Sequence, residues 1–260
     1  TFNTDTKKAE KVNISLASDN ALARNEIKDG ANYITAATVS PNGERMAITS
    51  RGEVFDVPVN KGVTKNITRT PGAHERMARW SPDGKSIAYI SDATGETEVY
   101  LRDVATGKVS QLTKNNDTYI NSITWSPDAK KLAITDRKNR IKLIDVPSGN
   151  VTTLLETSTG AARGVNFSPD SKWITYSREG DNNFSMIYAL NLADKKEIPI
   201  TDKWYSSYSP VFSTDGNYIV FTSARDFNPT YGQLEWNHVY NNMGGVYVAL
   251  LSKDTPSPFL

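Results

Sequence analysis

The sequence predicts an all-β fold, a β-propeller of four-stranded antiparallel blades, and three observations support this class. A thirteen-residue motif occurs five times, with its serines at positions 40, 81, 126, 168 and 213, so consecutive copies lie 41 to 45 residues apart. That spacing is the period of a propeller blade. Alternating strand patterns follow each copy, and turn residues separate them at regular intervals. The copies are TVSPNGERMAITS (38–50), RWSPDGKSIAYIS (79–91), TWSPDAKKLAITD (124–136), NFSPDSKWITYSR (166–178) and VFSTDGNYIVFTS (211–223).

The second copy shows how one blade is encoded. The segment SPDG supplies turn chemistry, because Pro82 fixes φ, the Asp83 carboxylate bonds to nearby backbone and Gly84 accepts a positive φ. The run before this turn reads as the innermost strand, in which Trp80 is expected to pack between blade faces. From the inside outward, the four expected strands are RMARW (76–80), KSIAYIS (85–91), TEVYLRDV (97–104) and VSQLT (109–113).

The repeat divides the chain into five near-complete blades and a partial one. FNTDTKKAEKVNI (2–14) aligns with RDVATGKVSQLTK (102–114), so the chain is expected to begin with the last two strands of a blade. The final blade ends after its third strand. We therefore expect a piece of a longer propeller. The repeat does not decide between a closed ring and an open arc of blades. The expected parts are a partial blade (1–28), blades at 29–70, 71–115, 116–157, 158–203 and 204–252, and an exit linker (253–260).

Composition excludes several classes of function. Lys and Arg number 30 against 29 Asp and Glu, so no net field attracts nucleic acid or an anionic membrane. The longest apolar run, VYVALL (246–251), is far shorter than a membrane span, which argues against membrane insertion. The chain has no cysteine, which excludes disulfides and fits a cytoplasmic or a bacterial periplasmic location. The segment TFNTDTKKAEK resembles neither a signal nor a transit peptide. The alternative is that a leader peptide has been removed.

The sequence predicts no catalytic, cofactor or metal site. Its two histidines, His74 and His238, form no metal-binding pattern, and neither a nucleophile elbow nor a phosphate loop occurs. Most serines fall in the repeated turn, where turn hydrogen bonds explain them. A Ser-His-Asp set assembled in space remains an alternative.

The most concentrated polar segment is TPGAHERMARW (70–80), which connects one blade to the inner strand of the next. We expect its His74, Glu75 and Arg76 at one mouth of the central channel, as a rim for a peptide or other ligand. The competing interpretation is an inter-blade salt bridge or turn bond of Glu75 and Arg76. Residues aligned with Arg76 in the other blades would complete a ring able to bind a carboxylate, unless they are only a solvated rim. The aligned residues are Thr35, Arg76, Asn121, Arg163 and Tyr208.

One irregularity interrupts the repeat in the last blade. The connection between its second and third strands is an insertion at 223–245, and such insertions often serve binding or docking. Four aromatic residues make it a candidate interface, either with a partner or with another domain of the same polypeptide. They could instead fold back and cover their own blade. These residues are Phe227, Tyr231, Trp236 and Tyr240.

Several of these segments together resemble the tricorn protease family, in the region of its second, seven-bladed propeller. The string TRTPGAHERMARWSPDGKSIAYISDATGETEVYLRD (68–103) carries the strongest likeness, and NFSPDSKWITYSR, FSTDGNYIVFTSARDFNPTY and VYVALLSKDTPSPF continue it in order. The likeness spans about residues 32–259. The chain departs from the family pattern at Met77, where an acidic residue is usual.

The resemblance implies that this chain is not itself an enzyme. In tricorn-like serine peptidases, two propellers precede a catalytic region with a PDZ-like module, and the second propeller admits or filters the peptide substrate. The family's nucleophile and histidine would lie beyond Leu260, so neither His74 nor His238 is expected to act as a base. The implied partners are peptide substrates or other domains of the same polypeptide, whose parent could be an oligomer. The alternative is a non-enzymatic TolB-like propeller for protein–protein binding.

Overall fold

The computed structural model describes residues 1–15, 29–226, 229–232, 238–240 and 242–259, with only the backbone of His238 and Tyr240. The chain forms two compact units, Thr1–Asn32 and Tyr33–Leu260. In the first unit, β1 (Phe2–Asn3) pairs antiparallel with β2 (Lys8–Ala9). The Asn3 carboxamide oxygen accepts two backbone N–H groups of the intervening turn, which fixes this short hairpin.

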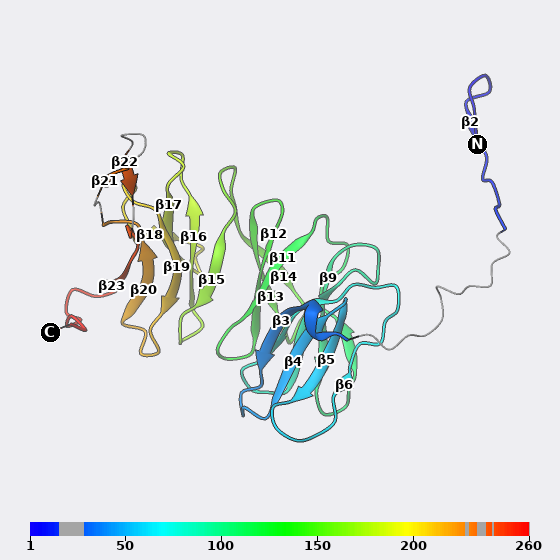
Figure 1. Cartoon of the computed structure of the whole chain (residues 1–260), viewed down its shortest axis with the longest axis horizontal. Helices are drawn as coiled ribbons and strands as arrows, with labels where there is room; N and C mark the ends of the chain where they lie inside the picture. The colour runs from blue at the N-terminus through cyan, green and yellow to red at the C-terminus, as the bar shows by residue number, and fades with distance from the viewer. Residues whose placement is uncertain (16–28, 227–228, 233–237, 241, 260) are drawn as a thin grey trace. The chain divides into compact units, whose positions relative to one another are not determined.

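The second unit confirms the predicted fold class: it is a series of antiparallel sheets that we call blades 1 to 5 (Figure 1). Blades 1 to 4 each have four strands, and blade 5 has three in the described part of the chain. A 3-10 helix, Ala31–Tyr33, precedes blade 1. The strands are β3 (Ile34–Val39), β4 (Arg45–Ser50), β5 (Glu53–Pro58) and β6 (Lys65–Asn66) in blade 1; β7 (Arg76–Trp80), β8 (Ser86–Ser91), β9 (Glu98–Asp103) and β10 (Val109–Gln111) in blade 2; β11 (Ile120–Trp125), β12 (Lys131–Asp136), β13 (Arg140–Asp145) and β14 (Val151–Glu156) in blade 3; β15 (Arg163–Phe167), β16 (Trp173–Glu179), β17 (Ser185–Asn191) and β18 (Glu197–Pro199) in blade 4; and β19 (Ser207–Phe212), β20 (Tyr218–Ser223) and β23 (Gly245–Leu250) in blade 5.

The repeated Ser-Pro-Asp-Gly segment forms the tight turn between the first two strands of a blade. In blade 2, the Ser81 hydroxyl donates to Asp83 at 2.6 Å, and the same carboxylate oxygen accepts the N–H of Lys85 at 3.1 Å. The Ser81 oxygen accepts the N–H of Ser86 at 2.9 Å, where β8 begins. Because the turn satisfies its own polar groups, Ser81 can be buried between blades.

The cores lie between consecutive blades. Figure 1 shows the blades following one another in chain order, and the inner strand of each blade lies beside that of the next. Ile90 and Val99 of blade 2 pack with Ile120 and Leu132 of blade 3, and all four are fully buried. Burying each such side chain contributes about 1.5–3 kcal/mol. Stacking of blade faces is therefore what holds this unit together.

The two terminal faces of the stack are exposed in the described part of the chain. Val246 of blade 5 and Ile187 of blade 4 occupy equivalent positions in their blades. Val246 pairs with Thr222, nine residues after Ser213, and Ile187 pairs with Ser177, nine residues after Ser168. Ile187 is 0% exposed and Val246 is 70% exposed. At the other end, Ile34 and Val39 of blade 1 are exposed. The burial of a repeat residue is thus set by the neighbouring blade.

Candidate functional site

A β-bulge interrupts the inner strand of every blade near its start, where the aligned sequence positions fall. In β7 the pairing with β8 shifts between Arg76 and Arg79, and in β15 the pairing with β16 shifts between Arg163 and Asn166. Equivalent shifts occur in β3, β11 and β19. Bulges change the direction of side chains and recur beside functional sites. Each shift contains or begins at one of Thr35, Arg76, Asn121, Arg163 and Tyr208.

In three blades the residue after the aligned position adopts a left-handed backbone. The φ angles are 55° at Met77, 63° at Gly164 and 51° at Ser209. Met77 stands where the family pattern has an acidic residue, and its side chain packs against the apolar cluster between blades 2 and 3. An apolar residue suits that environment, which explains the departure.

Arg76 fastens blade 2 to blade 3. Its side chain donates a hydrogen bond to the backbone oxygen of Ile120, and its guanidinium lies 3.8 Å from the ring centroid of Tyr119. Arg76 is only 9% exposed, and burial lowers the pKa of its guanidinium below the ordinary value. A hydrogen bond from a charged donor is worth about 1.5–3 kcal/mol. The contact crosses between blades, as the competing interpretation of Arg76 proposed, but the acceptor is a backbone carbonyl.

A second arginine shares the same aromatic ring. The guanidinium of Arg137, from the turn after β12, lies 4.4 Å from the ring centroid of Tyr119, and Arg137 is exposed. The sequence reasoning missed both Tyr119 and Arg137, because they lie outside the aligned column. The signal that could have found them is an aromatic residue placed directly before the inner strand of blade 3.

Hydrogen bonds tie His74 to its own blade and Glu75 to both its own blade and blade 1, and His74 is exposed whereas Glu75 is buried. The N–H of His74 donates to Asp92 at 2.7 Å, and the N–H of Glu75 donates to the Gly52 oxygen at 2.8 Å. Glu75 is 1% exposed and accepts the Ser91 hydroxyl at 2.9 Å. Gly52 has φ +79°, and a Cβ there would stand 2.9 Å from the His74 ring, so only glycine fits. The rim role of His74 and Glu75 stays a prediction.

The other aligned residues differ from Arg76 in being exposed. Asn121, Arg163 and Tyr208 stand at the starts of β11, β15 and β19, and Thr35 stands at the start of β3. Within the described residues, the side chain of Arg163 makes no ion pair. The repeat therefore places these side chains at the same end of successive inner strands. The structure keeps Arg76 in an inter-blade contact.

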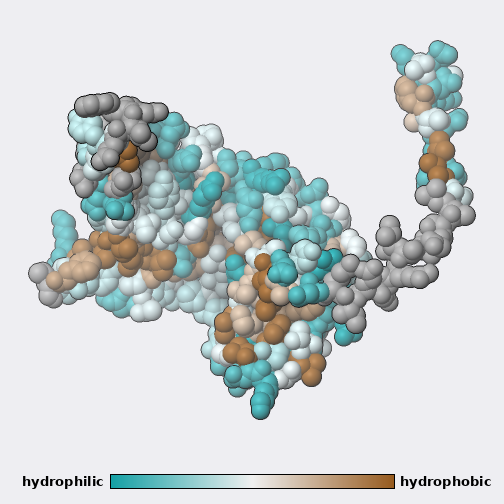
Figure 2. All heavy atoms as spheres, in the orientation of Figure 1, coloured by the Kyte–Doolittle hydropathy of each residue, from teal (hydrophilic) through white to brown (hydrophobic). Residues whose placement is uncertain are grey.

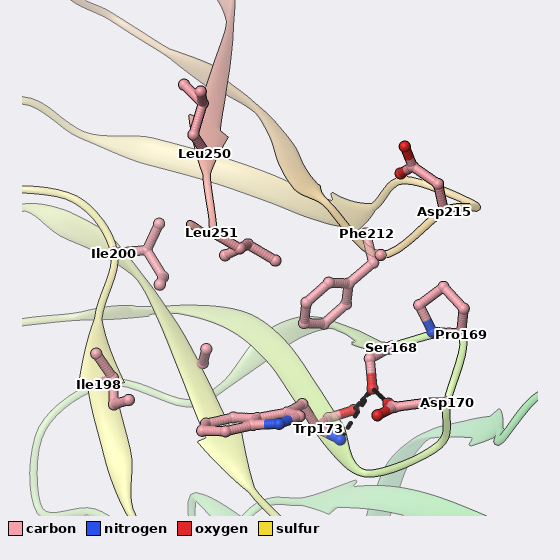
Figure 3. Close-up of a pocket in the computed structure, with 12 residues that line it drawn as sticks. Ser168, Pro169, Asp170, Trp173, Ile198, Ile200, Phe212, Asp215, Leu250 and Leu251 are labelled. Atoms are coloured by element: carbon pink, nitrogen blue, oxygen red, sulfur yellow. Dashed lines mark hydrogen bonds between the residues drawn. The ribbon is translucent and has the colours of Figure 1, made fainter. Parts of the chain in front are cut away.

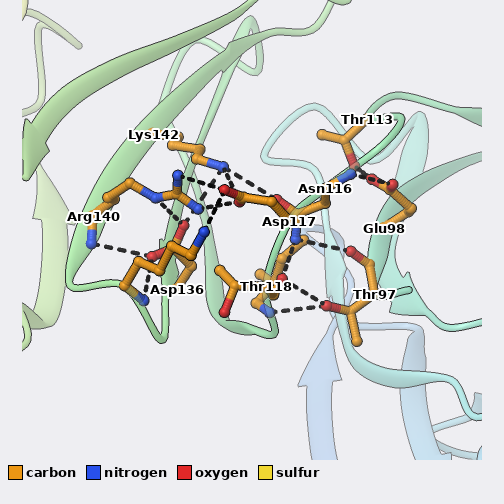
Figure 4. Close-up of polar contacts among 11 residues, drawn as sticks. Thr97, Glu98, Thr113, Asn116, Asp117, Thr118, Asp136, Arg140 and Lys142 are labelled. Carbon is orange, nitrogen blue, oxygen red and sulfur yellow. Dashed lines mark hydrogen bonds and ion pairs between the residues drawn. The ribbon is translucent and has the colours of Figure 1, made fainter.

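A polar network secures the connection between blades 2 and 3 (Figure 4). Buried Glu98 accepts the Thr113 hydroxyl and the N–H of Asn116, so it holds the chain that leaves β10. Asp117 pairs with Arg140, and with Lys138 at 2.7 Å. These bonds hold the pKa of the Asp117 carboxyl well below its usual range. The network is internally compensated, which is the ordinary arrangement of a structural contact.

The insertion between β20 and β23 contributes a short hairpin. Its strands β21 (Pro229–Tyr231) and β22 (His238–Tyr240) pair antiparallel. Tyr231 is 70% exposed. Phe227 and Trp236 lie outside the described residues, as does the side chain of Tyr240. The interface role of this insertion stays a prediction.

The described side chains contain no group of three His, Asp or Glu residues that could hold a metal ion. No helix in the described part of the chain is long and apolar enough to cross a membrane. The arrangement on the inner strands offers hydrogen-bonding side chains and the exposed guanidinium of Arg163. Such groups bind peptide carboxylates and amides.

Comparison with known proteins shows which family of propellers this chain resembles. Residues 34–260 match the family model described as the tricorn protease second beta propeller domain. The chain is 25% identical over 238 residues to tricorn protease homolog 1 of Streptomyces coelicolor, covering 89% of this chain and 22% of that protein. It is 23% identical to a putative tricorn-like protease C-terminal subunit of Sulfurisphaera tokodaii, covering 95% of this chain and 28% of that protein. The chain therefore spans about a quarter of these relatives.

Solved structures show the same fold. The crystal structure of the tricorn protease superposes with a TM-score of 0.80 at 19% identity, covering 99% of this chain and 25% of that one. A putative TolB from Agrobacterium tumefaciens superposes with a TM-score of 0.58 at 22% identity, covering 84% of this chain and 90% of that one. Because the family model covers most of the residues, this chain belongs to the family of the tricorn protease second β-propeller.

Proposed function

We propose that this chain is the propeller module of a tricorn-like serine peptidase, where it is a scaffold and a peptide gate for a catalytic region outside these residues. The observation that carries the proposal is the repeated bulge at the start of the inner strands. At this bulge Asn121, Arg163 and Tyr208 are exposed in three successive blades of a tricorn propeller. Peptides that pass this end of the propeller would meet these groups first.

The chemistry of these residues suits a gate better than a reaction centre. Arg163 supplies a planar, permanently charged guanidinium for a peptide carboxylate. Tyr208 and Asn121 supply hydrogen-bonding groups that recognise amides without a fixed sequence. Arg76 contributes only through the position of blade 3, because its guanidinium is occupied by Ile120 and Tyr119.

A second candidate is a TolB-like propeller that binds proteins without a peptidase region. A 28-residue segment is 57% identical to the Tol-Pal system protein TolB of Xanthomonas oryzae, and TolB structures share the fold. The short matching segment covers 11% of this chain, whereas the tricorn family model covers residues 34–260. The breadth of the match favours the peptidase module.

The proposal is tested in the full-length peptidase that contains this propeller. Arg163→Ala is expected to raise KM for peptides with a free carboxylate severalfold at low ionic strength, and less at high ionic strength, with kcat unchanged. Arg137→Ala is a matched control for loss of an exposed arginine beside the inner strands. Equal KM values for the wild type and Arg163→Ala would refute the gate. A native polypeptide without a peptidase region would instead favour the TolB-like function.

A further inference from the structure

A crevice of about 600 Å³ opens between blades 4 and 5. Its position is set by the Ser168 turn, which follows the end of β15, and by the Phe212 end of β19. Arg163 begins β15, so the crevice lies at the opposite end of the inner strands from the proposed gate. It is a separate surface, and its ligand is inferred independently of the proposed function.

The crevice has one apolar side and one acidic side (Figure 3). Trp173 and Phe212 are half-buried in its lining. Figure 3 shows Ile198 and Ile200 on one side, and Asp170 and Asp215 on the other. The exposed Leu250 and Leu251 lie above the tryptophan ring in the same view. Figure 2 shows apolar residues gathered toward the end of the unit that carries β23. A site of this kind fits a side chain that is apolar and adjacent to a positive charge.

The hydrogen bonds that join neighbouring turns differ from one junction to the next. Between blades 3 and 4, the Ser171 hydroxyl accepts the N–H of Asp128 at 3.2 Å, which ties the two turns together. Gly216 takes the place of Ser171 in the turn of blade 5 and has no hydroxyl. Between blades 2 and 3, the Trp125 indole N–H donates to the Arg79 oxygen at 3.2 Å, whereas blade 5 has Phe212 at that position. Neither of these two hydrogen bonds has a counterpart among the described residues at the junction of blades 4 and 5. The Phe212 N–H instead donates to the side-chain oxygen of Asn166 in blade 4 at 3.2 Å.

The equivalent crevice between blades 1 and 2 is smaller and differently charged. It measures about 260 Å³, and Asn42 and Arg45 stand where the larger crevice has Asp170 and Trp173. Its apolar floor is Trp80. The repeat supplies an aspartate at this position in blades 2 to 5, and the smaller crevice contains one of them, Asp83. The crevice between blades 4 and 5 differs in combining two aspartates with a larger apolar lining.

Both aspartates are fixed in ionised form by the turns that carry them. The Ser168 hydroxyl and the N–H of Lys172 donate to Asp170, and the Ser213 hydroxyl and the N–H of Asn217 donate to Asp215. These bonds lower the pKa of both carboxyl groups. Among the described residues, the one salt bridge of this pair joins Asp170 to exposed Lys172 at 3.9 Å. The Asn217 side chain also donates to Asp215 at 2.8 Å. Both aspartates are nevertheless exposed, so a cationic partner can reach them from solvent.

We propose that the crevice binds an extended peptide segment in which a large apolar side chain is followed by an arginine or lysine. The apolar side chain enters between Trp173, Ile200 and Leu250, and the cation lies against Asp170 and Asp215. The Trp173 indole N–H makes no hydrogen bond within the described part of the chain, so it can donate to a peptide carbonyl. Charge complementarity selects this partner over an acidic or a purely apolar one.

The test uses NMR titration of the ¹⁵N-labelled 260-residue chain with the blocked peptide acetyl-Ala-Phe-Arg-Ala-amide. Chemical-shift changes are expected at the Trp173 indole and at Gly216. The charge-reversed peptide acetyl-Ala-Phe-Glu-Ala-amide is expected to bind at least tenfold more weakly. Equal binding of the two peptides, or shifts confined to other surfaces, would overturn the proposal.

Variants separate the two sides of the crevice. Asp170→Asn with Asp215→Asn is expected to lower affinity for the arginine peptide about tenfold. Ile198→Ser, at an exposed position, is expected to weaken both peptides. Gly216→Ser restores the hydroxyl of blade 4 and should tie the turns together, which reduces binding. Arg45→Ala in the smaller crevice is the control and should leave binding unchanged. Unaltered affinity in the double aspartate variant would refute the charge assignment.

Discussion

The junction between blades 2 and 3 and the junction between blades 4 and 5 are built from the same repeat but differ in how they are held. The first carries Arg76 on the Ile120 carbonyl, the Asp117 network and the Trp125 bond to Arg79. The second contains an open crevice, and its aligned arginine, Arg163, is exposed. Both junctions bury an apolar cluster.

The difference teaches that the repeat specifies the blade, while single residues decide what happens between blades. Apolar burial joins every pair of neighbouring blades. Polar groups at the blade ends then either fasten a junction or stay free to meet a ligand. The junction of blades 2 and 3 is thus a structural joint, and the junction of blades 4 and 5 carries the two surfaces for which we propose a ligand.

The largest expected contrast comes from the aromatic residues at the two junctions. Trp125→Ala removes a half-buried indole that packs against the cluster between blades 2 and 3, together with its hydrogen bond to Arg79, and it should cost about 3–5 kcal/mol of unfolding free energy. Phe212→Ala removes a ring that lines an open crevice, and it should cost about 1–2 kcal/mol. Urea unfolding followed by circular dichroism measures both values. Equal losses would show that the two junctions are packed alike.

Substitutions at two equivalent turn residues should change the unfolding free energy by smaller amounts, with one variant stabilised and the other destabilised. Ala129 in blade 3 has φ 56°, so Ala129→Gly relieves a left-handed backbone and should stabilise the chain by about 0.5–1 kcal/mol. Gly216 in blade 5 has φ +74°, so Gly216→Ala should destabilise it by about 1 kcal/mol. Melting temperatures of the two variants provide the check. A stabilising Gly216→Ala would contradict the turn geometry.

The smallest expected effect is the pH dependence of the Asp117 contact. The pKa of Asp117 is lowered in the folded chain, first by its bond to Arg140 and then by Lys138. Its contribution to stability is therefore complete above the unfolded value of about 3.9 and is lost as pH falls below it. The stability difference between the wild type and Asp117→Asn should shrink between pH 5 and pH 3. A constant difference over that range would exclude an ionic role for Asp117.

Sequence periodicity predicted the blades well because it encodes contacts within a blade. The turn serines and the alternating strands act on neighbours that are close in the chain, whereas the inner tryptophan Trp125 bonds to Arg79 of the preceding blade. Arg76 and Arg163 occupy the same repeat position, yet one is buried on Tyr119 and the other is exposed. That outcome depends on the residue before the next inner strand, which is Tyr119 in blade 3 and Ser206 in blade 5.

The crevice between blades 4 and 5 was also beyond the sequence reasoning. It is lined by residues that lie far apart in the sequence, such as Trp173 and Ile200 of blade 4 and Leu250 of blade 5. Hydropathy and spacing within one blade do not show which side chains of two neighbouring blades line the same space. The aromatic residues Phe227 and Trp236 lie outside the described residues, and their interface role stays a prediction.

Arg76 and Arg163 occupy the same repeat position, and we assign a structural role to the first and ligand binding to the second. The unfolding free energies of Arg76→Ala and Arg163→Ala test this assignment most directly. Arg76→Ala leaves the Ile120 carbonyl without its charged donor and should lose about 2 kcal/mol. Arg163→Ala should change stability by no more than about 0.5 kcal/mol, as exposed substitutions do. A loss for Arg163→Ala as large as that for Arg76→Ala would show that both arginines are structural and would remove the basis for the gate.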